Sequence, residues 1–513
     1  MSQEQSQAQP DAQAGSSGKA AGVGPAVGGV RSSERTKSWH DESGNITPEH
    51  LAWLKARRRD SARLQACQRS EGQGDGSVRA EIKTPEKVRK LQRTLYRRAK
   101  AEPKYRFWSL YGDIMRRDLL EHALQRVARN KGGPGVDGQT VESITQNPEV
   151  ERQWLDALHQ ELKTKQYRPS PVLRVWIPKS NGSLRPLGIP TVKDRVVQMA
   201  AMLVLMPIFE ADFHPRSFGF RPKRNAHQAI EEITWALSRG RLEVVDVDLA
   251  KYFDTIPQGP LLRLVARRVS DGGVLRLLKM WLRAPVQEQD KDGRRRIKPN
   301  TSGTPQGGVI SPLLANLYLN ALDWAVNQQV QSKPVLVRFA DDLVILSRPG
   351  QGQGLRERLG KWVTARGLRI NEEKTRLVKG QDGFDFLGFS VRWQRGRHTR
   401  RWYAHVQPSA RSEQHLRDSV RQILNHWTQP RRITDVVAEL NTLLRGWCGY
   451  FHFRHSLQVI WDLQGWVRAR FKGWLWRKHG CKKGKWKGYP DDLLHGRYGL
   501  WRMPTRAAWK AHD

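Results

Sequence analysis

The stretch that decides the fold is Val335-Leu336-Val337-Arg338-Phe339-Ala340-Asp341-Asp342-Leu343-Val344-Ile345-Leu346. Strand-forming residues on both sides of the two aspartates predict a hairpin with the carboxylates at its turn. Two adjacent carboxylates repel each other, and partial burial adds a cost for both charges. A divalent cation offsets that cost, and oxygen ligands suit magnesium. The turn is therefore predicted to contribute to a metal site, although an isolated Asp-Asp pair is also typical of an ordinary turn or helix cap.

A further carboxylate occurs upstream in similar surroundings, within Val244-Val245-Asp246-Val247-Asp248-Leu249. If this strand neighbours the hairpin in one sheet, Asp248 comes close to Asp341 and Asp342. Three such carboxylates can hold two magnesium ions, which activate an attacking hydroxyl, steady a leaving oxygen and favour in-line displacement. The two strand regions are separated by helical patterns, which predicts an α+β core with helices packed against an antiparallel sheet.

The composition indicates a large and strongly basic protein. The chain has 513 residues, of which 38% are hydrophobic, so several domains with a sizeable core are expected. Lys and Arg number 89 against 50 Asp and Glu, and the net charge of +39 favours nucleic acid over a membrane surface as a partner. No apolar run is long enough to span a bilayer, and no signal peptide is recognisable. Three separated cysteines argue against a disulfide framework or a zinc ribbon and fit a reducing cytoplasm.

Two further motifs carry residues suited to a nucleotide. Lys179 and Arg185 flank the turn Asn181-Gly182 of a predicted hairpin, where they could grip a triphosphate, although alone they would more often be surface charges. Gln306 lies in the glycine-rich stretch at residues 302–308, where glycines allow close backbone approach to a ligand and the amide can donate and accept. Such a loop alone is equally compatible with an ordinary connection.

A series of short motifs, taken in order along the chain, resembles the group II intron-encoded reverse transcriptases/maturases. The resemblance covers residues 85–479, and the ordered set is far more specific than any one motif. The motifs are Tyr167-Arg168-Pro169, Ile177-Pro178-Lys179, Arg185-Pro186-Leu187-Gly188-Ile189-Pro190, Asp194-Arg195-Val196-Val197-Gln198, Ser217-Phe218-Gly219-Phe220-Arg221-Pro222, residues 248–254, residues 303–312, Phe339-Ala340-Asp341-Asp342, residues 368–374 and Phe386-Leu387-Gly388-Phe389.

The resemblance implies a right-hand polymerase fold of the α+β class, with fingers and a palm on an antiparallel sheet and then an α-helical thumb or maturase domain. The expected divisions are a basic, largely disordered extension over residues 1–84, an N-terminal extension with fingers over 85–240, a palm over 241–395, a helical thumb over 396–479 and a basic nucleic-acid-binding segment over 480–513. The loop at residues 130–138 resembles the part of the family's N-terminal extension that holds template.

The resemblance also implies which residues hold the metal ions. Asp248, Asp341 and Asp342 would be the catalytic carboxylates of the palm and would bind two Mg²⁺ ions together with the backbone carbonyl of Leu249. The neighbouring carboxylates expected to support the strand and the loop, rather than to react, are Asp246 and Asp254.

The incoming dNTP would meet four further side chains in this family. Lys179 and Arg185 would contact its triphosphate, and Gln306 would line the nucleotide pocket. Phe253 stands where a bulky side chain faces the sugar 2′ position, so the enzyme would prefer deoxynucleotides over ribonucleotides.

The C-terminal part contains a stretch similar to the family's maturase signature, at residues 440–451. Its apolar positions at helical spacing are expected to be core, namely Leu440, Leu443, Leu444 and Trp447. The segment that follows has many basic and aromatic residues and no acidic residue between Asp462 and Asp491, a pattern typical of nucleic-acid contact. The candidate contact residues are Arg468, Arg470, Lys472, Arg477, Lys478, Lys482, Lys483 and Lys485.

The expected function is that of an RNA-directed DNA polymerase that also binds its structured intron RNA and assists splicing and mobility. Its partners would be group II intron RNA, an RNA template with a DNA primer or target, and dNTPs, with no membrane; it would be cytoplasmic and associate with the nucleoid when bound to DNA. No cysteine lies near Cys481, so the His/Cys-rich nuclease domain of longer members is not expected, and priming would need an existing 3′ end.

Three alternatives remain open from the sequence. The first is a splicing or RNA-binding factor without polymerase activity, which the complete set of aspartates, Gln306, Lys179 and Arg185 disfavours. The second is a domesticated reverse transcriptase that serves defence or repair, which the core motifs do not distinguish from an intron-encoded enzyme. The third is RNA-templated RNA synthesis, for which a small residue in place of Phe253 is expected.

Overall fold

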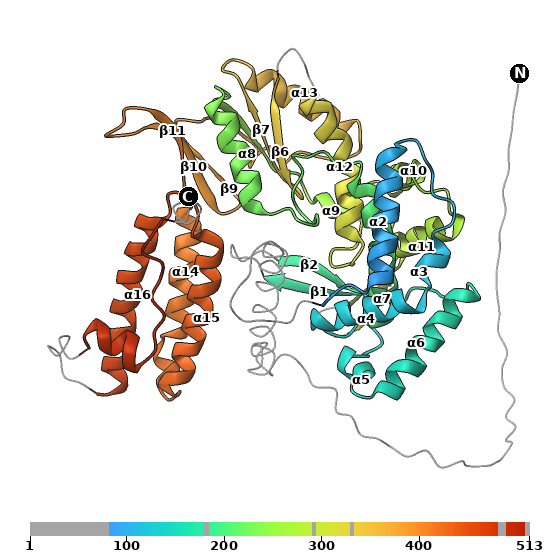
Figure 1. Cartoon of the computed structure of the whole chain (residues 1–513), viewed down its shortest axis with the longest axis horizontal. Helices are drawn as coiled ribbons and strands as arrows, with labels where there is room; N and C mark the ends of the chain where they lie inside the picture. Colours follow the sequence, from blue (N-terminus) through green and yellow to red (C-terminus); the bar gives the residue numbers. More distant parts are fainter. Residues whose placement is uncertain (1–81, 179–183, 290–293, 329–332, 481–488, 508–513) are drawn as a thin grey trace, which may run out of the picture. The chain divides into compact units, whose positions relative to one another are not determined.

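The computed structural model describes residues 82–178, 184–289, 294–328, 333–480 and 489–507, and within these ranges the chain is a mixed α/β protein with small sheets and many helices (Figure 1). The helices are α2 (Glu86–Ala101), α3 (Tyr111–Ile114), α4 (Arg117–Arg129), α5 (Val141–Thr145), α6 (Pro148–Lys163), α7 (Val192–Glu210), α8 (Ala226–Ser238), α9 (Tyr252–Thr255), α10 (Gln258–Ala266), α11 (Gly272–Arg283), α12 (Ser311–Asn327), α13 (Gly352–Thr364), α14 (Ala410–Ile423), α15 (Ile433–Phe451) and α16 (Leu457–Lys478), with short turns η1 (His426–Thr428) and η3 (Leu493–Arg497). The strands are β1 (Val172–Pro178), β2 (Leu184–Ile189), β3 (Glu243–Val247), β4 (Val286–Gln289), β5 (Arg295–Lys298), β6 (Val335–Phe339), β7 (Asp342–Ser347), β8 (Arg376–Lys379), β9 (Phe384–Phe386), β10 (Phe389–Arg395) and β11 (Trp402–Pro408).

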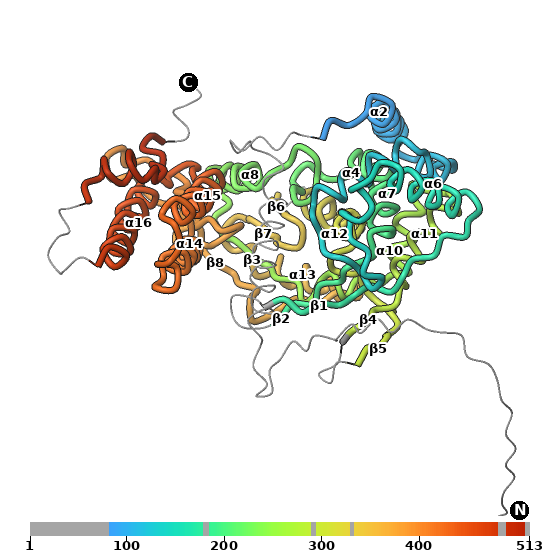
Figure 2. Tube along the Cα trace, turned by 90° about the horizontal axis from the view of Figure 1, so that it is seen from below, coloured from blue at the N-terminus to red at the C-terminus, as the bar shows by residue number. Residues whose placement is uncertain are grey.

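Helix α7 is the central element of the N-terminal half. It is buried on nearly all sides because α2, α3, α4 and α12 pack around it. Figure 2 shows α4 and α12 next to it. Its first turn is closed by Thr191, whose side chain accepts from the backbone N–H of Asp194 at 3.2 Å. The Asp194 carboxylate in turn accepts from the Tyr167 hydroxyl at 2.6 Å. The loop at 130–138 is fixed here as well, since Arg195 donates to the carbonyl of Gly133 at 2.9 Å.

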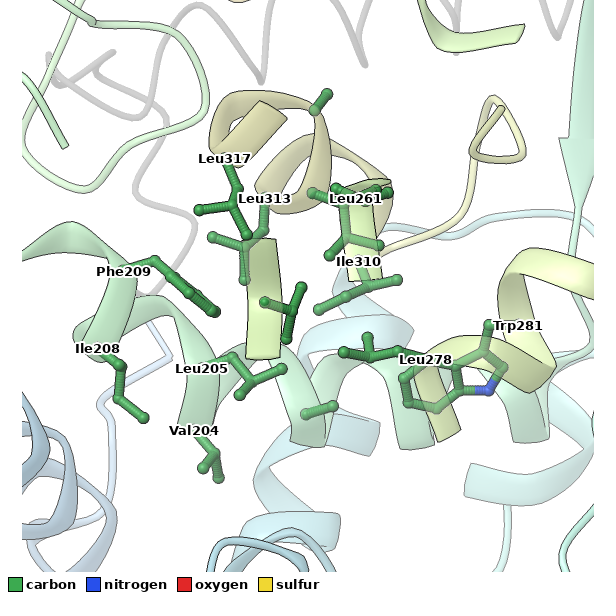
Figure 3. Packing of buried hydrophobic residues seen from close by; sticks show 14 of the residues in the cluster. Val204, Leu205, Ile208, Phe209, Leu261, Leu278, Trp281, Ile310, Leu313 and Leu317 are labelled. Atoms are coloured by element: carbon green, nitrogen blue, oxygen red, sulfur yellow. The ribbon is translucent and has the colours of Figure 1, made fainter. Parts of the chain in front are cut away.

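The larger hydrophobic core joins α7 to three helices that are distant along the chain. Figure 3 shows Leu205 and Phe209 of α7 packed with Leu261 of α10, Leu278 of α11 and Leu313 of α12. All five side chains are nearly inaccessible to solvent. Burial of a large apolar side chain stabilises the fold by roughly 1.5–3 kcal/mol, so this cluster makes the helices a rigid support for the neighbouring sheet.

The sheet that carries the aspartates has the strand order β6-β7-β3-β8, and all its neighbouring strands are antiparallel. In the β6–β7 hairpin Phe339 pairs with Asp342, which confirms the predicted hairpin and leaves Ala340 and Asp341 as its turn. The sheet is covered on both faces, because Val244 of β3 belongs to one hydrophobic cluster and Val245 to the other.

Two further sheets were only partly expected. Strands β1 and β2 form the predicted hairpin, but β1 also pairs in parallel with β4, giving a sheet of order β2-β1-β4-β5. The third sheet has the order β11-β10-β9. Its strand β11 lies within residues 396–479, which we expected to be helical, and it pairs along its length with β10, so the first helix of this part begins only at Ala410.

Three helices form the C-terminal part, with α14 packed against both α15 and α16 (Figure 1). The core prediction for α15 is confirmed: Leu440, Leu444 and Trp447 are buried, and Leu443 is partly buried against the same cluster. Trp474 of α16 is inaccessible to solvent, and its indole N–H donates to the Thr428 hydroxyl at 3.1 Å. Among the described residues, no helix has the length and apolar character needed to cross a membrane.

Candidate active site

The antiparallel register of β3 and β7 brings the predicted carboxylates to one end of the sheet. Val247 pairs with Leu343, so Asp248, which follows β3, and Asp342, which begins β7, lie at the same end. Both residues line a cavity of about 290 Å³. Asp342 is exposed, and 39% of the Asp248 side chain is accessible to solvent. The cavity is therefore open to a ligand from solution.

Asp341 lies in the turn directly before Asp342, at the same end of the sheet as Asp248. Burial raises the pKa of Asp341 above its ordinary value, and the charges of Arg185 and Arg338 oppose that rise. The negative charge of Asp248 raises the pKa of Asp341 further.

Asp248 is held by the segment between α13 and β8. The backbone N–H of Asn371 donates to the carbonyl of Asp248 at 2.8 Å, and the Asn371 side-chain amide donates to the Asp248 carboxylate at 2.9 Å. The ammonium of Lys374 lies 3.5 Å from the same carboxylate oxygen, and the Thr375 hydroxyl accepts from the backbone N–H of Asp248 at 3.3 Å. These contacts explain the motif at residues 368–374, whose role the sequence did not indicate.

The donor atoms at this end of the sheet suit magnesium in type. Carboxylate oxygens are hard ligands, and a bound cation would relieve the repulsion between Asp248 and Asp341. In the part of the chain that the structure describes, no three His, Cys, Asp or Glu side chains already stand close enough together to hold a metal ion. One carboxylate oxygen of Asp248 is already engaged by Asn371 and Lys374.

A buried arginine fixes the backbone of the β6–β7 turn by a hydrogen bond. Arg338 is inaccessible to solvent, and its guanidinium makes two hydrogen bonds to the Asp323 carboxylate, at 2.8 and 2.6 Å. Its remaining terminal nitrogen donates to the Asn316 side chain and to the carbonyl of Ala340, both at 2.8 Å. The carbonyl that precedes Asp341 is thus fixed by a fully paired charge in the core, an arrangement that costs much less than an unpaired one.

The turn also needs a glycine as its neighbour. Ala340 adopts a left-handed backbone with φ of 60°, which is unusual for a residue with a side chain. A Cβ added at Gly219 would lie 2.4 Å from the Ala340 backbone nitrogen. The carbonyl of Gly219 accepts from the Asn316 amide at 2.7 Å, and the backbone N–H of Phe218 donates to the carbonyl of Arg338 at 2.9 Å. These contacts account for the motif at residues 217–222.

The predicted nucleotide-contacting residues are partly joined by hydrogen bonds. Nε of Arg185 donates to the side-chain carbonyl of Gln306 at 3.1 Å, and the Gln306 amide donates to the Asp254 carboxylate at 2.9 Å. Asp254 therefore supports Gln306, in line with the supporting role expected of it, and burial raises the pKa of its carboxyl. The glycine-rich loop lies against β2, because the backbone N–H of Gly188 donates to the carbonyl of Gln306 at 2.5 Å.

Leu249 follows β3, and Phe253 lies in the short helix α9. Leu249 is buried and forms an isolated bridge with Ile370, and Phe253 is partly buried. The carbonyl of Phe253 accepts from the backbone N–H of Thr304 at 2.7 Å, which joins the glycine-rich loop to α9. Lys179 lies outside the described residues, so its contact with the triphosphate stays a prediction.

Asp246 stands behind Asp248 on the same side of β3 and lines the same cavity. Burial raises the pKa of Asp246 to about 6, Arg376 on the paired strand opposes the shift, and Asp248 and Asp385 add to it. Asp385 also lines the cavity, together with residues 386–388. The sequence does not single out Asp385, because one acidic residue in a short strand carries no signal of its own.

The basic residues of the C-terminal part are largely engaged within the chain. Arg468 and Lys472 form ion pairs with Asp491, the latter at 3.2 Å. Lys478 donates to the carbonyls of Gln429 and Arg431, at 2.5 and 2.9 Å. These three cations therefore tie α16 to neighbouring segments, and their role in nucleic-acid contact stays a prediction.

The remaining candidates of that group differ in their surroundings. Arg477 donates to the carbonyl of Leu424 at 3.4 Å, and the Arg470 guanidinium lies 5.4 Å from the ring centre of Trp466. The last three candidates fall outside the described residues and are Lys482, Lys483 and Lys485.

Comparisons with known proteins match this geometry. Residues 177–391 match the reverse transcriptase (RNA-dependent DNA polymerase) family, and residues 413–489 match the group II intron maturase-specific domain. The first match contains β3, the β6–β7 hairpin and the glycine-rich loop. The second contains α15 and α16 and reaches beyond residue 479, where we expected the thumb to end.

Several relatives support the same assignment. Protein YkfC of Escherichia coli is 35% identical over 351 residues, which cover 61% of this chain and 90% of YkfC. Group II intron-encoded protein LtrA of Lactococcus lactis is 35% identical over 225 residues, or 43% of this chain and 36% of LtrA, so the match spans about a third of that relative. A putative COX1/OXI3 intron 2 protein of Saccharomyces cerevisiae is 34% identical over 220 residues, or 42% of this chain and 24% of that protein. The chain therefore belongs to the group II intron-encoded reverse transcriptases and joins an RNA-directed DNA polymerase domain to a maturase-specific domain.

Proposed function

We propose that DNA synthesis takes place at the end of the β3–β7 pair, where Asp248, Asp341 and Asp342 would hold two Mg²⁺ ions with the carbonyl of Leu249. One observation carries this proposal: the antiparallel pairing of Val247 with Leu343 brings carboxylates that are 93 positions apart (341 − 248) to one end of the sheet. Under this proposal, the sheet β6-β7-β3-β8 is the palm of a right-hand polymerase, and β1 and β2 belong to its fingers.

The chemistry at this site is phosphoryl transfer to a primer. Two Mg²⁺ ions, when bound, favour deprotonation of the primer 3′-hydroxyl and stabilise charge on the leaving pyrophosphate. The chain positions the reactants: the cavity beside Asp248 and Asp342 admits the primer end, and Arg338 keeps the turn in its strained conformation. Positioning and electrostatic stabilisation supply most of the catalysis in such transfers.

Nucleotide selection would depend on the pocket formed by Arg185, Gln306 and Phe253. The positive charge of Arg185 partly opposes the rise in the pKa of Asp341, so Arg185 can contact a triphosphate that approaches the carboxylates. The hydrogen bond from Arg185 to Gln306 holds both side chains at the pocket. Phe253 would exclude a 2′-hydroxyl, so deoxynucleotides would be preferred. Comparing dGTP with GTP incorporation on one template tests this selection.

RNA binding would involve the C-terminal helices and the general excess of positive charge. The match to the maturase-specific domain supports intron RNA as the partner of residues 413–489. Splicing chemistry would belong to the RNA, and the protein would stabilise its active fold.

The test separates synthesis from binding. Asp341→Ala should abolish Mg²⁺-dependent extension of a DNA primer on an RNA template, because it removes a metal ligand. RNA affinity should stay within about twofold of the parent. Equal extension rates in the variant and the parent would contradict the metal assignment.

A further inference from the structure

A half-exposed tryptophan on α8 is surrounded by arginines. The Trp235 side chain is 41% accessible to solvent. The guanidinium carbons of Arg216, Arg241 and Arg239 lie 5.3, 5.6 and 5.7 Å from its ring centre. Cation–π attraction of this kind holds both partners in place. Arg239 is exposed, whereas Arg216 and Arg241 are partly buried and each donates a further hydrogen bond within the chain, to Asn327 and to the carbonyl of Lys333 respectively. The result is a preformed aromatic and cationic platform on the protein surface.

The positive charge of this platform is only partly balanced. Arg216 pairs with Glu232 at 2.9 Å. Burial lowers the pKa of Arg241, and so do the like charges of Arg216, Arg348 and Arg239. Arg348 follows Ser347, which pairs with Glu243, two residues after Arg241. Among the described residues, neither Arg239 nor Arg348 has a carboxylate partner. Clustered arginines that repel one another are stabilised by a polyanion.

The platform is separate from the polymerase cavity. Glu243 pairs with Ser347 at the end of β3 and β7 opposite Asp248, and Arg241 and Arg348 lie just beyond this pair. An extended strand rises by about 3.3 Å per residue, so Arg241 lies roughly 20 Å from Asp248. The cavity that contains Asp248 is lined by no residue of α8. Among the described residues, the Glu243 carboxylate forms no ion pair with these arginines; it accepts from the backbone N–H groups of Gly350 and Gly352 at 2.8 and 2.6 Å.

We propose that the arginine–tryptophan surface, formed by Arg216, Trp235, Arg239, Arg241 and Arg348, docks structured RNA outside the polymerase cavity. Its arginines would contact phosphates, and Trp235 would stack on one unpaired base. Structured RNA presents unpaired bases in loops and bulges, whereas the bases of duplex DNA are stacked and paired. The inference rests on the proposed function only in requiring that the chain bind structured RNA.

The experiment compares two charge-reversal variants of the full-length protein. The surface variant is Arg239→Glu with Arg348→Glu. The control is Arg267→Glu with Arg358→Glu, two exposed arginines on α10–α11 and α13 that carry the same change in net charge. Affinity is measured against salt concentration for a group II intron transcript and for an unrelated structured RNA of equal length. Primer extension on a short RNA–DNA duplex is measured in parallel.

The surface variant should lose at least tenfold in RNA affinity at 0.15 M salt, against less than threefold for the control. Each phosphate contact contributes about 0.7–0.9 to the slope of log affinity against log salt, so two lost contacts should reduce that slope by about 1.5. Trp235→Ala should lose about fivefold or more, while Trp235→Phe should remain near the parent because its ring still stacks.

Two results would overturn the inference. One is an equal RNA affinity of the surface and control variants. The surface would then not bind RNA, and an acidic protein would be the partner that fits its charge. The other is a loss of primer extension as large as the loss of RNA affinity, which would mean that the substitutions act on the fold or the polymerase site. The proposed preference for intron RNA fails separately: it is contradicted if the parent binds the two RNAs with equal affinity. In that case the surface and control variants can still be compared on either RNA.

Discussion

Arg338 and Asp323 form an ion pair in which neither side chain is accessible to solvent, with hydrogen bonds of 2.8 and 2.6 Å between guanidinium and carboxylate. The same guanidinium holds the carbonyl of Ala340, the residue before Asp341. The pair therefore connects the helix α12 to the turn that carries Asp341 and Asp342, two of the three carboxylates that we propose bind metal. The pair is therefore expected both to stabilise the fold and to position the turn, and two variants separate these effects.

Replacing Arg338 with Ala should lower the free energy of unfolding by about 3–5 kcal/mol, because the Asp323 carboxylate is left buried without a partner. Urea denaturation of the parent and the variant measures this loss. DNA synthesis should fall as well, since the carbonyl of Ala340 loses its donor.

The double variant Arg338→Met with Asp323→Leu distinguishes the two roles. An apolar pair of similar size removes the unpaired charge, so much of the lost stability should return. Primer extension should remain low, because neither new side chain can donate to Ala340. Full recovery of the extension rate in the double variant would show that Arg338 matters for stability alone.

Gly219→Ala should disturb the same turn from the other side. The added Cβ would lie 2.4 Å from the backbone nitrogen of Ala340, and backbone atoms there cannot move without shifting Asp341. We expect a loss of about 1–3 kcal/mol in unfolding free energy and a lower extension rate. Gly360→Ala in α13 is a matched control, because nothing lies within 4 Å of its added Cβ, and it should be neutral or slightly stabilising. Equal extension rates of the two variants would disprove the steric argument.

Asp254→Ala should weaken nucleotide binding more than catalysis. The Gln306 amide would lose its acceptor, so Gln306 and Arg185 would no longer be fixed at the pocket. We expect KM for dNTP to rise about tenfold with a smaller change in kcat, because positioning of the substrate is lost while the metal ligands are retained. Steady-state extension kinetics on a homopolymer template measure both constants. Asp254→Asn can still accept from Gln306 and should restore most of the KM, and a variant that lowers kcat alone would contradict this role.

His214 predicts a pH dependence of stability. Burial lowers the pKa of His214 to about 4, from 6.5 for an ordinary histidine, although the nearby Asp323 charge partly opposes this. Its Nδ1 accepts from the backbone N–H of Arg216 at 3.1 Å, as a neutral ring can. Between pH 6.5 and 4 the unfolded chain therefore binds a proton that the folded chain does not, so stability falls as pH decreases through this range.

We expect this histidine to destabilise the parent by about 1–3 kcal/mol at pH 4.5 relative to pH 7.5. Other groups titrate over the same range, so the informative quantity is the difference between the parent and His214→Gln in urea denaturation at the two pH values. The variant should lose less stability than the parent on acidification. An identical pH dependence in both proteins would contradict the lowered pKa.

The sequence predicted that the strand before Asp248 and the hairpin that carries Asp341 and Asp342 share one sheet, because strand patterns surround both groups. The pairing of Val247 with Leu343 confirms the shared sheet, and the joint role of the three carboxylates stays a prediction. The core positions of α15 followed from helical spacing. The Arg338–Asp323 pair could not be predicted in this way, because a charged residue in an apolar strand and another in a helix give no sign that they meet. The same holds for Lys472, whose partner Asp491 is brought to it only by the fold.

The central claim is that Asp248 and Asp341 act together on one reaction, and a double-mutant cycle tests it most directly. Mg²⁺-dependent primer extension on an RNA template is measured for Asp248→Asn, Asp341→Asn and the double variant, with RNA affinity as the control for folding. If both carboxylates serve one metal site, each single variant should lose on the order of a thousandfold in rate, and the double variant should lose little more. A double variant whose loss equals the product of the two single losses, or a single variant that extends at the parental rate, would contradict the account.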